Sequence, residues 1–589
     1  MEIPAEYAKL REVVTKVDDL IQEIYPDFFG KNSSHPVLPV KRSKIIHDSI
    51  WGTSLFNWQE LGVIDSPILQ RLRDIHQLGL AYLVYPSGQH TRFEHSLGTA
   101  IVASRVFDNL RSRNELKLRQ LVEAAYPKQK ADWESILKRI HAELRMAALL
   151  HDSGHALFSH ASESVYARVP EIQQAAADLT RLVGKKRNAG ELLSFAIAQS
   201  KGLQMYLARC GARVDDGGRV EARQVALDFD NISLLIVGRS CHPHLQFLGD
   251  IVSSGFDADK LDYLIRDATA CGLAITYDIE RYMAFVKIHN ESTEEKSGEL
   301  RSLFEKVLGV PDLEASAIIS GDKISLYRLR LPAEAITCVE QVVIDKFMLY
   351  SYLYHHAKVR AAEVVLERAL SKMLGIGNPV PPSLKEVLKT LFLMTDSRFL
   401  TVWQDDAVQD SELRESSYRL YARLLPRVIY SLGGRVGDPE EKAALATFIG
   451  YMDSPNRAEI IRQLEEGIGV TLVATQAKTE GGPRWSKAAE ALHETGGWVD
   501  APKPLSFEDK EVLLPTSSPD VEPASLSALF PIDKWAKAYL NHVYRVRVYA
   551  YSEYASIVSD AGKTALRKAL GIHDDVFYDA KIKRRRSLT

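Results

Sequence analysis

The sequence of 589 residues predicts a mostly α-helical protein with a smaller α+β lobe at its C-terminal end. Apolar residues recur at helical spacing through much of the first half, and only two passages show a clear two-residue period. The composition is that of an ordinary globular protein, with 46% hydrophobic and 26% charged residues. The net charge of −3 provides no general attraction to nucleic acid or to acidic membranes.

The elements follow in order along the chain. Apolar side chains from Tyr7 to Ile24 recur at helical spacing and predict an amphipathic first helix, which the connector "GKNSSHPVLPVKRSK" ends. The pattern from about 60 to 275 is mostly helical. "SAIISGDKISLYRL" predicts a hairpin around Gly321, and "HVYRVRVYAYS" predicts a late strand. The Gly-, Pro- and Ser-rich region 476–525 predicts surface loops or a lid, and "KIKRRRSLT" predicts a solvated tail.

These shifts in pattern predict four segments: a first helix with its connector (1–34), a main helical domain (35–375), a helical region with a loop-rich insert (376–530) and a C-terminal lobe with a basic tail (531–589). The four cysteines are widely spaced, as expected in a reducing compartment. The N-terminal residues lack the apolar stretch of a signal peptide, and no segment has membrane-spanning length. We therefore expect a cytoplasmic protein without a membrane partner.

The stretch "HDSGHALFSH" places three of the 17 histidines and an aspartate within residues 151–160. A hydrophobic core has no use for so many groups that bind water, protons or metals. Two further stretches carry similar groups, "TRFEHSLGTA" with His95 and "FDADKLDYLIRDA" with Asp259. Together with His151 and Asp152 they form a mixed nitrogen and oxygen set, which suits Mn, Fe, Zn, Co or Ni and suits Mg less well.

Local geometry limits how this set can act. Adjacent side chains on a helix point about 100° apart, so His151 and Asp152 can share an ion only from a helix end. The apolar "MAALL" before them predicts a buried helix, and Gly154 is interpreted as leaving space beside the ion. His95 alone would more simply be an ordinary helix-end residue. All three stretches together favour a metal site.

The spaced pattern H…HD…D resembles that of the HD phosphohydrolase superfamily. The sequences that flank this pattern resemble more specifically those of the dNTP triphosphohydrolases with SAM-and-HD-domain architecture and their bacterial dGTPase relatives. "DSPILQRLRDIHQLGLAYLVYPSGQHTRFEHSLGTA", "HDSGHALFSH" and "DADKLDYLIRDA" carry the resemblance, and "FMLYSYLYHHAKVRAAEVVLERAL" and "RVRVYAY" match more loosely. The resemblance covers roughly residues 40–370 and implies an HD-domain helical phosphohydrolase core.

The resemblance also implies roles for individual residues. It assigns one divalent metal per active site (Mn, Fe, Zn, Co, Ni or Mg) to His95, His151, Asp152 and Asp259, with an additional Mg on the triphosphate as an option. His155 and His160 would lie beside the α-phosphate, and Glu163 would orient His160, which would attack or protonate there. The implied substrate-binding residues are Gln77, Leu78, Arg92, Lys260, Tyr263, Asp267 and Lys346.

Within that set, the cations would contact the triphosphate, Asp267 would bind the 3′-hydroxyl, and Leu78 would exclude a ribose 2′-hydroxyl. Two departures from the family are visible. The family usually has a further histidine where this chain reads "KKRNAGELLSFA", so that Asn188 or Glu191 stands in its place. Lys346 occupies a position where arginine is common and lacks its bidentate fork.

A second nucleotide site is implied at a subunit interface. Lys44, Asp65, Gln70 and Arg73 match positions that bind an activating nucleotide in the family, and Pro67 suits the first turn of a helix that begins after Asp65. The alternative, that Asp65 simply caps that helix, is equally compatible with the sequence.

The sequence thus predicts a metal-dependent dNTP triphosphohydrolase, with dGTP as the first substrate to try and a deoxynucleoside and tripolyphosphate as products. A nucleotide-activated homo-oligomer, dimer or tetramer, is expected, in housekeeping pool balance or in antiviral nucleotide depletion. Two alternatives stay open: an HD-type phosphodiesterase or nuclease, which the absence of a basic stripe disfavours, and a non-catalytic nucleotide-sensing subunit. Nucleic acid is not the expected main partner.

Overall fold

The computed structural model describes residues 1–30, 43–214, 220–222, 227–293, 297–310, 318–320, 323–376, 381–432, 457–475, 485–502, 513–514, 531, 534–535, 544–570 and 578–579. Most of the predicted connector, most of the predicted loop region 476–525 and the whole basic tail lie outside these residues.

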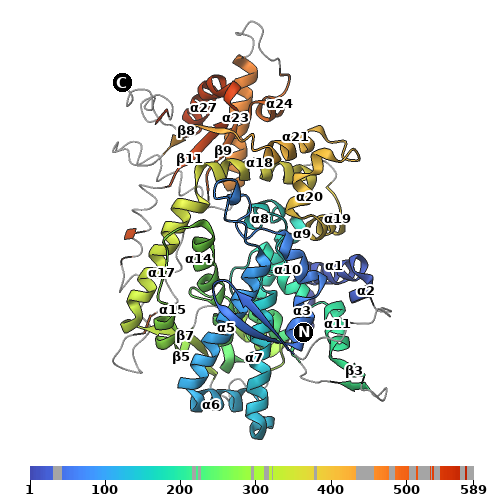
Figure 1. The fold of residues 1–589 in the computed structure, drawn as a ribbon, viewed down its shortest axis with the longest axis vertical. Helices are drawn as coiled ribbons and strands as arrows, with labels where there is room; N and C mark the ends of the chain where they lie inside the picture. The colour runs from blue at the N-terminus through green and yellow to red at the C-terminus, as the bar shows by residue number, and fades with distance from the viewer. Residues whose placement is uncertain are drawn as a thin grey trace. The chain divides into compact units, whose positions relative to one another are not determined.

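The chain divides into two compact units. The first contains Met1–Asp345, Leu370–Phe399 and Lys510–Leu529, and the second contains Lys346–Ala369, Leu400–Asp509 and Phe530–Thr589. The predicted mostly α-helical fold is confirmed for the described residues (Figure 1). The division into four sequence segments stays a prediction.

Most of the described α-helices belong to the first unit, and α17, α18 and α20 contribute residues to both units. The helices up to α20 are α1 (Ala8–Ile24), α2 (Pro26–Phe29), α3 (Trp58–Ile64), α4 (Pro67–Gln70), α5 (Arg92–Arg113), α6 (Glu115–Ala125), α7 (Trp133–Leu150), α8 (His160–Tyr166), α9 (Pro170–Val183), α10 (Ala189–Ala198), α11 (Lys201–Gly211), α12 (Phe229–Ile236), α13 (Gln246–Val252), α14 (Ala258–Cys271), α15 (Ile279–Phe285), α16 (Ser297–Ser302), α17 (Ile336–Leu349), α18 (Ala357–Met373), α19 (Leu384–Leu393) and α20 (Asp396–Leu400).

The predicted N-terminal helix is α1. Its buried face consists of Leu10, Val13, Val17, Leu20 and Ile21, at the spacing that places side chains on one side of a helix. This face packs against α9 and α10. The helix is therefore held by the hydrophobic contacts that its sequence pattern predicts.

Three helices of the first unit carry the residues of the predicted metal site. Helix α5 packs against both α7 and α14 (Figure 1). The last turn of α7, Met146–Leu150, is at most 1% exposed, which confirms that the apolar run before His151 is buried. This packing brings the start of α5, the end of α7 and the start of α14 to one place.

The described residues of the first unit also form three small sheets. Strands β1 (Ser43–Asp48) and β2 (Gly52–Asn57) pair antiparallel, as do β3 (Ala212–Val214) and β4 (Val220–Ala222). Strand β7 (Lys323–Pro332) pairs antiparallel with β5 (Lys287–Thr293) and with β6 (Ile319–Ser320), and parallel with β10 (Leu513–Leu514). The pairing of β6 with β7 confirms the predicted hairpin, whose turn at 321–322 lies outside the described residues.

The second unit combines a sheet with helices and agrees with the predicted α+β lobe. Its sheet has the order β12 (Tyr578–Asp579), β8 (Arg427–Leu432), β11 (Val546–Ala550) and β9 (Trp498–Asp500). The predicted late strand is β11, all of whose residues are buried. The helices of this unit are α21 (Ser411–Tyr421), α23 (Arg457–Thr475), α24 (Ala488–Thr495) and α27 (Ala555–Leu570).

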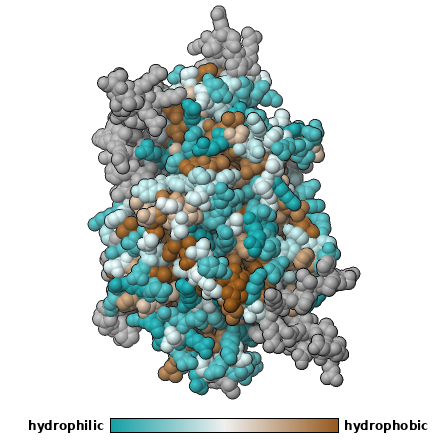
Figure 2. All heavy atoms as spheres, in the orientation of Figure 1, coloured by the Kyte–Doolittle hydropathy of each residue, from teal (hydrophilic) through white to brown (hydrophobic). Residues whose placement is uncertain are grey.

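On the face drawn in Figure 2, hydrophilic side chains are interspersed with scattered hydrophobic ones. Among the described residues, no helix is both long and apolar enough to cross a membrane. The four cysteines are buried as free thiols, in agreement with the expected lack of disulfides.

Candidate metal centre and active site

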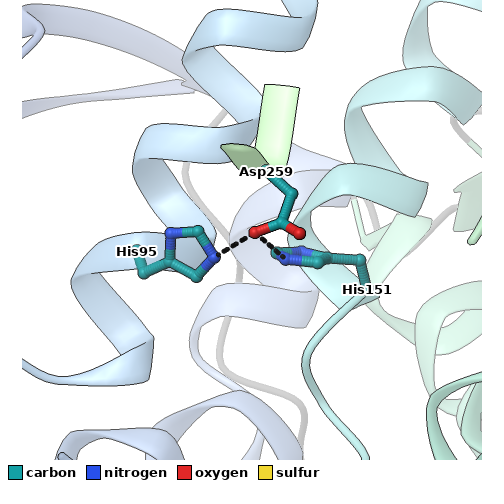
Figure 3. Close-up of side chains that lie close together, drawn as sticks. All are labelled: His95, His151 and Asp259. Atoms are coloured by element: carbon teal, nitrogen blue, oxygen red, sulfur yellow. Dashed lines mark ion pairs between the residues drawn. The ribbon is translucent and has the colours of Figure 1, made fainter. Parts of the chain in front are cut away.

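The structure brings the four predicted metal ligands together, and Figure 3 draws three of them, His95, His151 and Asp259. His95 comes from the first turn of α5, His151 follows α7 directly, and Asp259 comes from the first turn of α14. Asp259 Oδ1 lies 3.0 Å from His95 Nε2 and 3.7 Å from His151 Nε2. The carboxylate of Asp152 lies beside them, 3.5 Å from each of the same two nitrogens.

The end of α7 explains how two adjacent residues reach one point. The helix ends at Leu150, so His151 and Asp152 leave it where the backbone turns away. Gly154 is required for a different reason from the one that the sequence suggested. A Cβ atom there would lie 2.3 Å from Ser194 N and 2.6 Å from Gly190 O, so this glycine allows close packing against α10 rather than making room for an ion.

Neighbouring groups fix which ring nitrogen of each histidine faces the site. His95 Nδ1–H donates to Asp262 Oδ2 at 2.7 Å, and His151 Nδ1–H donates to the Ala148 carbonyl at 2.7 Å. The Nε2 atoms of both histidines are buried and make no hydrogen bond. A nitrogen with its lone pair directed into a polar site and its partner nitrogen held from behind is the arrangement expected of a metal ligand.

The carboxylate behind His95 is itself fixed. Asp262 accepts hydrogen bonds from Arg266 Nε and Nη2, each at 2.8 Å, and from Trp51 Nε1. Arg266 also pairs with Asp48 at 2.9 Å. Burial raises the pKa of Asp262, but the Arg266 charge outweighs it and lowers the value to about 2, so this group stays an anion.

The electrostatic environment favours a bound cation. Burial lowers the pKa of His95, but Asp259 and Asp262 outweigh it and raise the value to about 10. The pKa of Asp259 lies well below its ordinary value, because the two histidines outweigh the effect of burial. A divalent ion would satisfy the same carboxylates in place of protons on the imidazoles.

The donor set therefore fits a divalent transition metal. Two imidazole nitrogens and two carboxylates converge, and the ligand atoms of His95, His151 and Asp259 all lie within 4.8 Å of one another. Such a set suits Mn, Fe, Zn, Co or Ni by its chemistry.

A second cluster lies on the loop that follows the doublet. His160, the first residue of α8, donates from Nδ1 to Glu163 Oε2 at 3.1 Å, and the Gly190 N–H donates to Glu163 Oε1 at 3.0 Å. Burial raises the pKa of Glu163, but the hydrogen bond from His160 outweighs it and lowers the value to about 2. The His155 ring lies edge-on to that of His160, with centroids 4.9 Å apart.

His155 connects this cluster with the metal ligands. Its Nε2 lies 3.3 Å from Asp152 Oδ1, and its Nδ1 is buried and has no hydrogen-bond partner. Burial and then the nearby Arg92 charge lower its pKa. The imidazole is therefore neutral near pH 7.

Arg92 is the most buried cation of the site, with 1% of its surface exposed. Its Nη1 pairs with Asp152, its Nε donates to Ser159 Oγ at 2.8 Å, and its Nη2 is buried without a partner. Ser159 and Asp152 thus hold the guanidinium, and its Nη2 group can donate to a further acceptor.

The other predicted substrate-binding residues of the first unit occupy α14 and the segment before α5. Gln77 and Leu78 are buried, and Gln77 Oε1 has no hydrogen-bond partner. Asp267 accepts from His90 Nε2 at 2.8 Å, Lys260 Nζ donates to Asp257 at 2.8 Å and to the Ser254 carbonyl at 2.7 Å, and Tyr263 is half-buried.

Both departures from the family pattern are visible. Asn188 precedes α10 and accepts from Glu191 N at 2.7 Å, while Glu191 accepts from Asn188 N at 2.8 Å, so both side chains cap the helix. Lys346 belongs to the second unit, where its Nζ lies 6.0 Å from the centre of the Tyr350 ring.

The residues of the predicted activator site lie on separate elements. Lys44 is exposed on β1, and Gln70 Oε1 accepts from Arg73 Nε at 2.9 Å. Helix α4 begins at Pro67, as predicted, and Ser66 rather than Asp65 precedes its first turn. Asp65 instead ends α3, so the alternative in which it caps the following helix is wrong.

Sequence reasoning missed several residues that hold the site in place. Asp262 and Arg266 follow Asp259 at three- and seven-residue spacing on α14, a helical pattern that could have revealed them. Arg71 donates to the carbonyls of Ser153 and His155, and Asp396 accepts from Phe158 N; neither carries a local sequence signal.

No protein-family model matches the chain. The chain is 31% identical over 269 residues to the deoxynucleoside triphosphate triphosphohydrolase SAMHD1 homolog of Dictyostelium discoideum, covering 45% of this chain and 44% of that protein. It is 28% identical over 257 residues to SAMHD1 of Homo sapiens, covering 42% of this chain and 37% of that protein. By sequence, the chain is thus similar to these two dNTP triphosphohydrolases over less than half of its length.

An uncharacterized protein of Methanocaldococcus jannaschii is 28% identical over 330 residues, covering 56% of this chain and 49% of that protein. The chain thus spans less than half the length of each of these three proteins. The activity that gives the named relatives their names is therefore a proposal for this chain.

Proposed function

We propose that the protein is a metal-dependent dNTP triphosphohydrolase, which converts a dNTP and water into a deoxynucleoside and tripolyphosphate. The single observation that carries the proposal is the set of buried polar atoms that make no hydrogen bond in this part of the structure. They are Gln77 Oε1, Arg92 Nη2, His95 Nε2, His151 Nε2 and His155 Nδ1. Buried polar atoms are nearly always satisfied in folded proteins, so a cluster of exceptions indicates a ligand site.

The metal would be held by His95, His151, Asp152 and Asp259. When bound, a divalent cation supplies Lewis-acid polarisation of a phosphate oxygen. In this proposal Arg92 Nη2 donates to an α-phosphate oxygen, because Nε and Nη1 are already held by Ser159 and Asp152. Lys260 and Tyr263 contact the triphosphate further out, and the contact that the resemblance implies for Lys346 stays a prediction.

His160 is proposed as the proton donor to the leaving 5′-oxygen. Water adds to the α-phosphorus, the bond between phosphorus and O5′ breaks, and the electron pair remains on O5′, which takes a proton. Glu163 occupies His160 Nδ1–H, so Nε2 is the nitrogen that exchanges this proton. His155, neutral near pH 7, lies beside the same centre as an acceptor for a proton of the water.

Substrate selection is proposed to involve Leu78, Gln77 and Asp267. A leucine side chain against C2′ leaves no room for a ribose hydroxyl, and Asp267 accepts a hydrogen bond from the 3′-hydroxyl. We take dGTP as the first substrate. Lys44, Asp65, Gln70 and Arg73 are proposed to bind an activating nucleotide that promotes a dimer or tetramer in the cytoplasm, and a role in antiviral nucleotide depletion is one use of such an activity.

The test is product analysis of the purified protein in water enriched with oxygen-18. With dGTP and a divalent metal, we expect deoxyguanosine and tripolyphosphate, with the label in tripolyphosphate. Asp152→Asn and Asp259→Asn should abolish turnover. Asp405→Asn should retain it, because Asp405 is an exposed carboxylate that accepts the Ala407 N–H at 2.9 Å.

Other outcomes would contradict the proposal. Initial release of dGMP and pyrophosphate would exclude triphosphohydrolysis, and degradation of single-stranded DNA in place of dNTPs would favour the phosphodiesterase or nuclease alternative. Saturable dNTP binding without turnover, with any of the candidate metals, would favour the nucleotide-sensing alternative, which the capping roles of Asn188 and Glu191 in place of a histidine motivate.

A further inference from the structure

A buried carboxylate far along the chain holds the loop that carries His155 and His160. Asp396, the first residue of α20, is 1% exposed. Its Oδ1 accepts from Phe158 N at 2.6 Å, and its Oδ2 accepts from His76 N at 2.9 Å and from His76 Nδ1 at 2.7 Å. One side chain thus joins the loop after the metal doublet to the segment before α5.

The loop at this point has an unusual backbone. Phe158 and Ser159 have φ angles of +52° and +57°, and Arg423 is the one other non-glycine residue with a positive φ in the described part of the chain. Ser159 has a ψ of −129°, a combination that is ordinarily adopted by glycine. Such backbone persists only where surrounding contacts hold it, and it is frequent at active sites.

The contacts that hold this backbone continue to the proposed catalytic groups. Ser159 Oγ donates to the His76 carbonyl and accepts from Arg92 Nε at 2.8 Å. The Phe158 ring packs edge-on against Phe399 of α20, with centroids 5.7 Å apart. His160 follows Ser159 directly, so the direction in which it leaves the loop is set by these two residues.

We infer that Asp396 is a positioning residue, which fixes the Phe158–Ser159 turn and through it the places of His160 and Arg92. The inference rests on the proposed function, because it assigns those two groups to the reaction. Among the described residues, the side-chain hydrogen bonds of Asp396 go to Phe158 and His76 and not to a metal ligand. It acts through the backbone amide of Phe158 and through His76.

A carboxylate is the side chain that these contacts require. Three donors face Asp396, and both of its oxygens accept. In Asp396→Asn the amide group can keep one oxygen toward Phe158 or toward His76, and its NH2 then opposes the donors on the other side. One attachment of the loop is therefore lost with little change in volume.

The experiment compares Asp396→Asn with Asp278→Asn. Asp278 is an exposed carboxylate of the same unit that accepts a single backbone hydrogen bond, from Arg281 N at 2.9 Å. We expect Asp396→Asn to lower kcat by roughly tenfold to a hundredfold, with metal content unchanged and KM altered by less than about threefold. Hydrogen exchange of the Phe158 amide in the substrate-free protein should accelerate. Asp278→Asn should change none of these.

A second background distinguishes positioning from general destabilisation. Glycine adopts the Ser159 backbone without strain, so in Ser159→Gly the loop depends less on Asp396. The added cost of Asp396→Asn in that background should shrink to less than about threefold in kcat, a non-additive result expected of coupled residues. An equal loss in both backgrounds would overturn the inference, as would wild-type kcat in Asp396→Asn.

Two further outcomes keep the reasoning testable. If Asp396→Asn does not fold, His76→Ala removes one donor and leaves the carboxylate in place. It should lower kcat by less than the loss expected for Asp396→Asn and still accelerate hydrogen exchange of the Phe158 amide. Unchanged exchange would overturn the inference. Absence of dNTP hydrolysis by the wild-type protein would instead refute the proposed function, whatever the exchange rates.

Discussion

The carboxylate behind His95 should control metal affinity without binding the metal. In Asp262→Asn one carboxylate oxygen becomes an NH2 group. Asp262 Oδ2 accepts from His95 Nδ1 at 2.7 Å and from Arg266 Nε at 2.8 Å, while Oδ1 accepts from Arg266 Nη2 at 2.8 Å and from Trp51. Either orientation of the amide therefore opposes two donors.

The magnitude follows from the role of that hydrogen bond. Loss of an outer-shell partner of a metal-bound histidine costs about tenfold to a hundredfold in affinity, which corresponds to about 1.4 to 2.7 kcal/mol. The depressed pKa of Asp262, about 2, indicates that the anionic form is the one the site uses. We therefore expect the dissociation constant for Mn or Co to rise by that factor.

Competition with a chromophoric chelator measures this affinity without reference to turnover. Asp48→Asn is the matched control, because Asp48 also pairs with Arg266, at 2.9 Å, and accepts backbone hydrogen bonds from Ile50 and Trp51 instead of bonding His95. Its metal affinity should stay within about threefold of wild type. Equal losses in the two variants, or wild-type affinity in a folded Asp262→Asn protein, would refute the role of Asp262.

Three further predictions concern the surroundings of the site. Gly154→Ala should lower the free energy of unfolding by about 1–3 kcal/mol, measured by thermal melts, because its Cβ would lie 2.3 Å from Ser194 N. Gly298→Ala is the control, because a Cβ there would have no atom within 4 Å, and it should leave the melt unchanged. Burial raises the pKa of Glu143 to about 7 from an ordinary 4.5, so the folded state binds the proton more tightly than the unfolded state does. The free energy of unfolding should therefore fall by up to about 3 kcal/mol as the pH rises from 4.5 to about 7. Glu143→Gln should remove this pH dependence, measured by melts at different pH. Glu163→Gln should lower kcat by roughly a hundredfold at unchanged metal content, measured by elemental analysis; wild-type kcat would contradict the assigned orientation of His160.

The helical fold and the cluster of metal ligands could be predicted because their signals are local. A helix such as α1 shows its buried face in a few turns of sequence, and His151 and Asp152 are neighbours. The β1–β2 hairpin was missed for a physical reason. Its first strand buries only Asp48, so no alternation of apolar residues marks it.

The residues that support the site could not be predicted, because their partners are distant in sequence. Asp396 lies 238 residues from Phe158, and Trp51 lies 211 residues from Asp262. No spacing rule connects such pairs, and an isolated aspartate is most often a surface residue. Gly154 is a similar case: the sequence indicated that a glycine is needed there, but the atoms that leave no room for a side chain belong to α10, about 40 residues later.

The charges of the centre suggest an order of binding. Two carboxylates, Asp152 and Asp259, face one buried guanidinium, Arg92, so these three groups together are negative. Lys260 adds little positive charge there, because its ammonium is paired with Asp257 at 2.8 Å. Without a metal, the raised pKa of His95 keeps its imidazole protonated, so the centre is close to neutral and offers a polyphosphate little attraction. A divalent cation held by the two histidines and two carboxylates would make it positive. The same carboxylates that attract the cation thus make anion binding depend on it, which places metal binding before nucleotide binding in the proposed reaction.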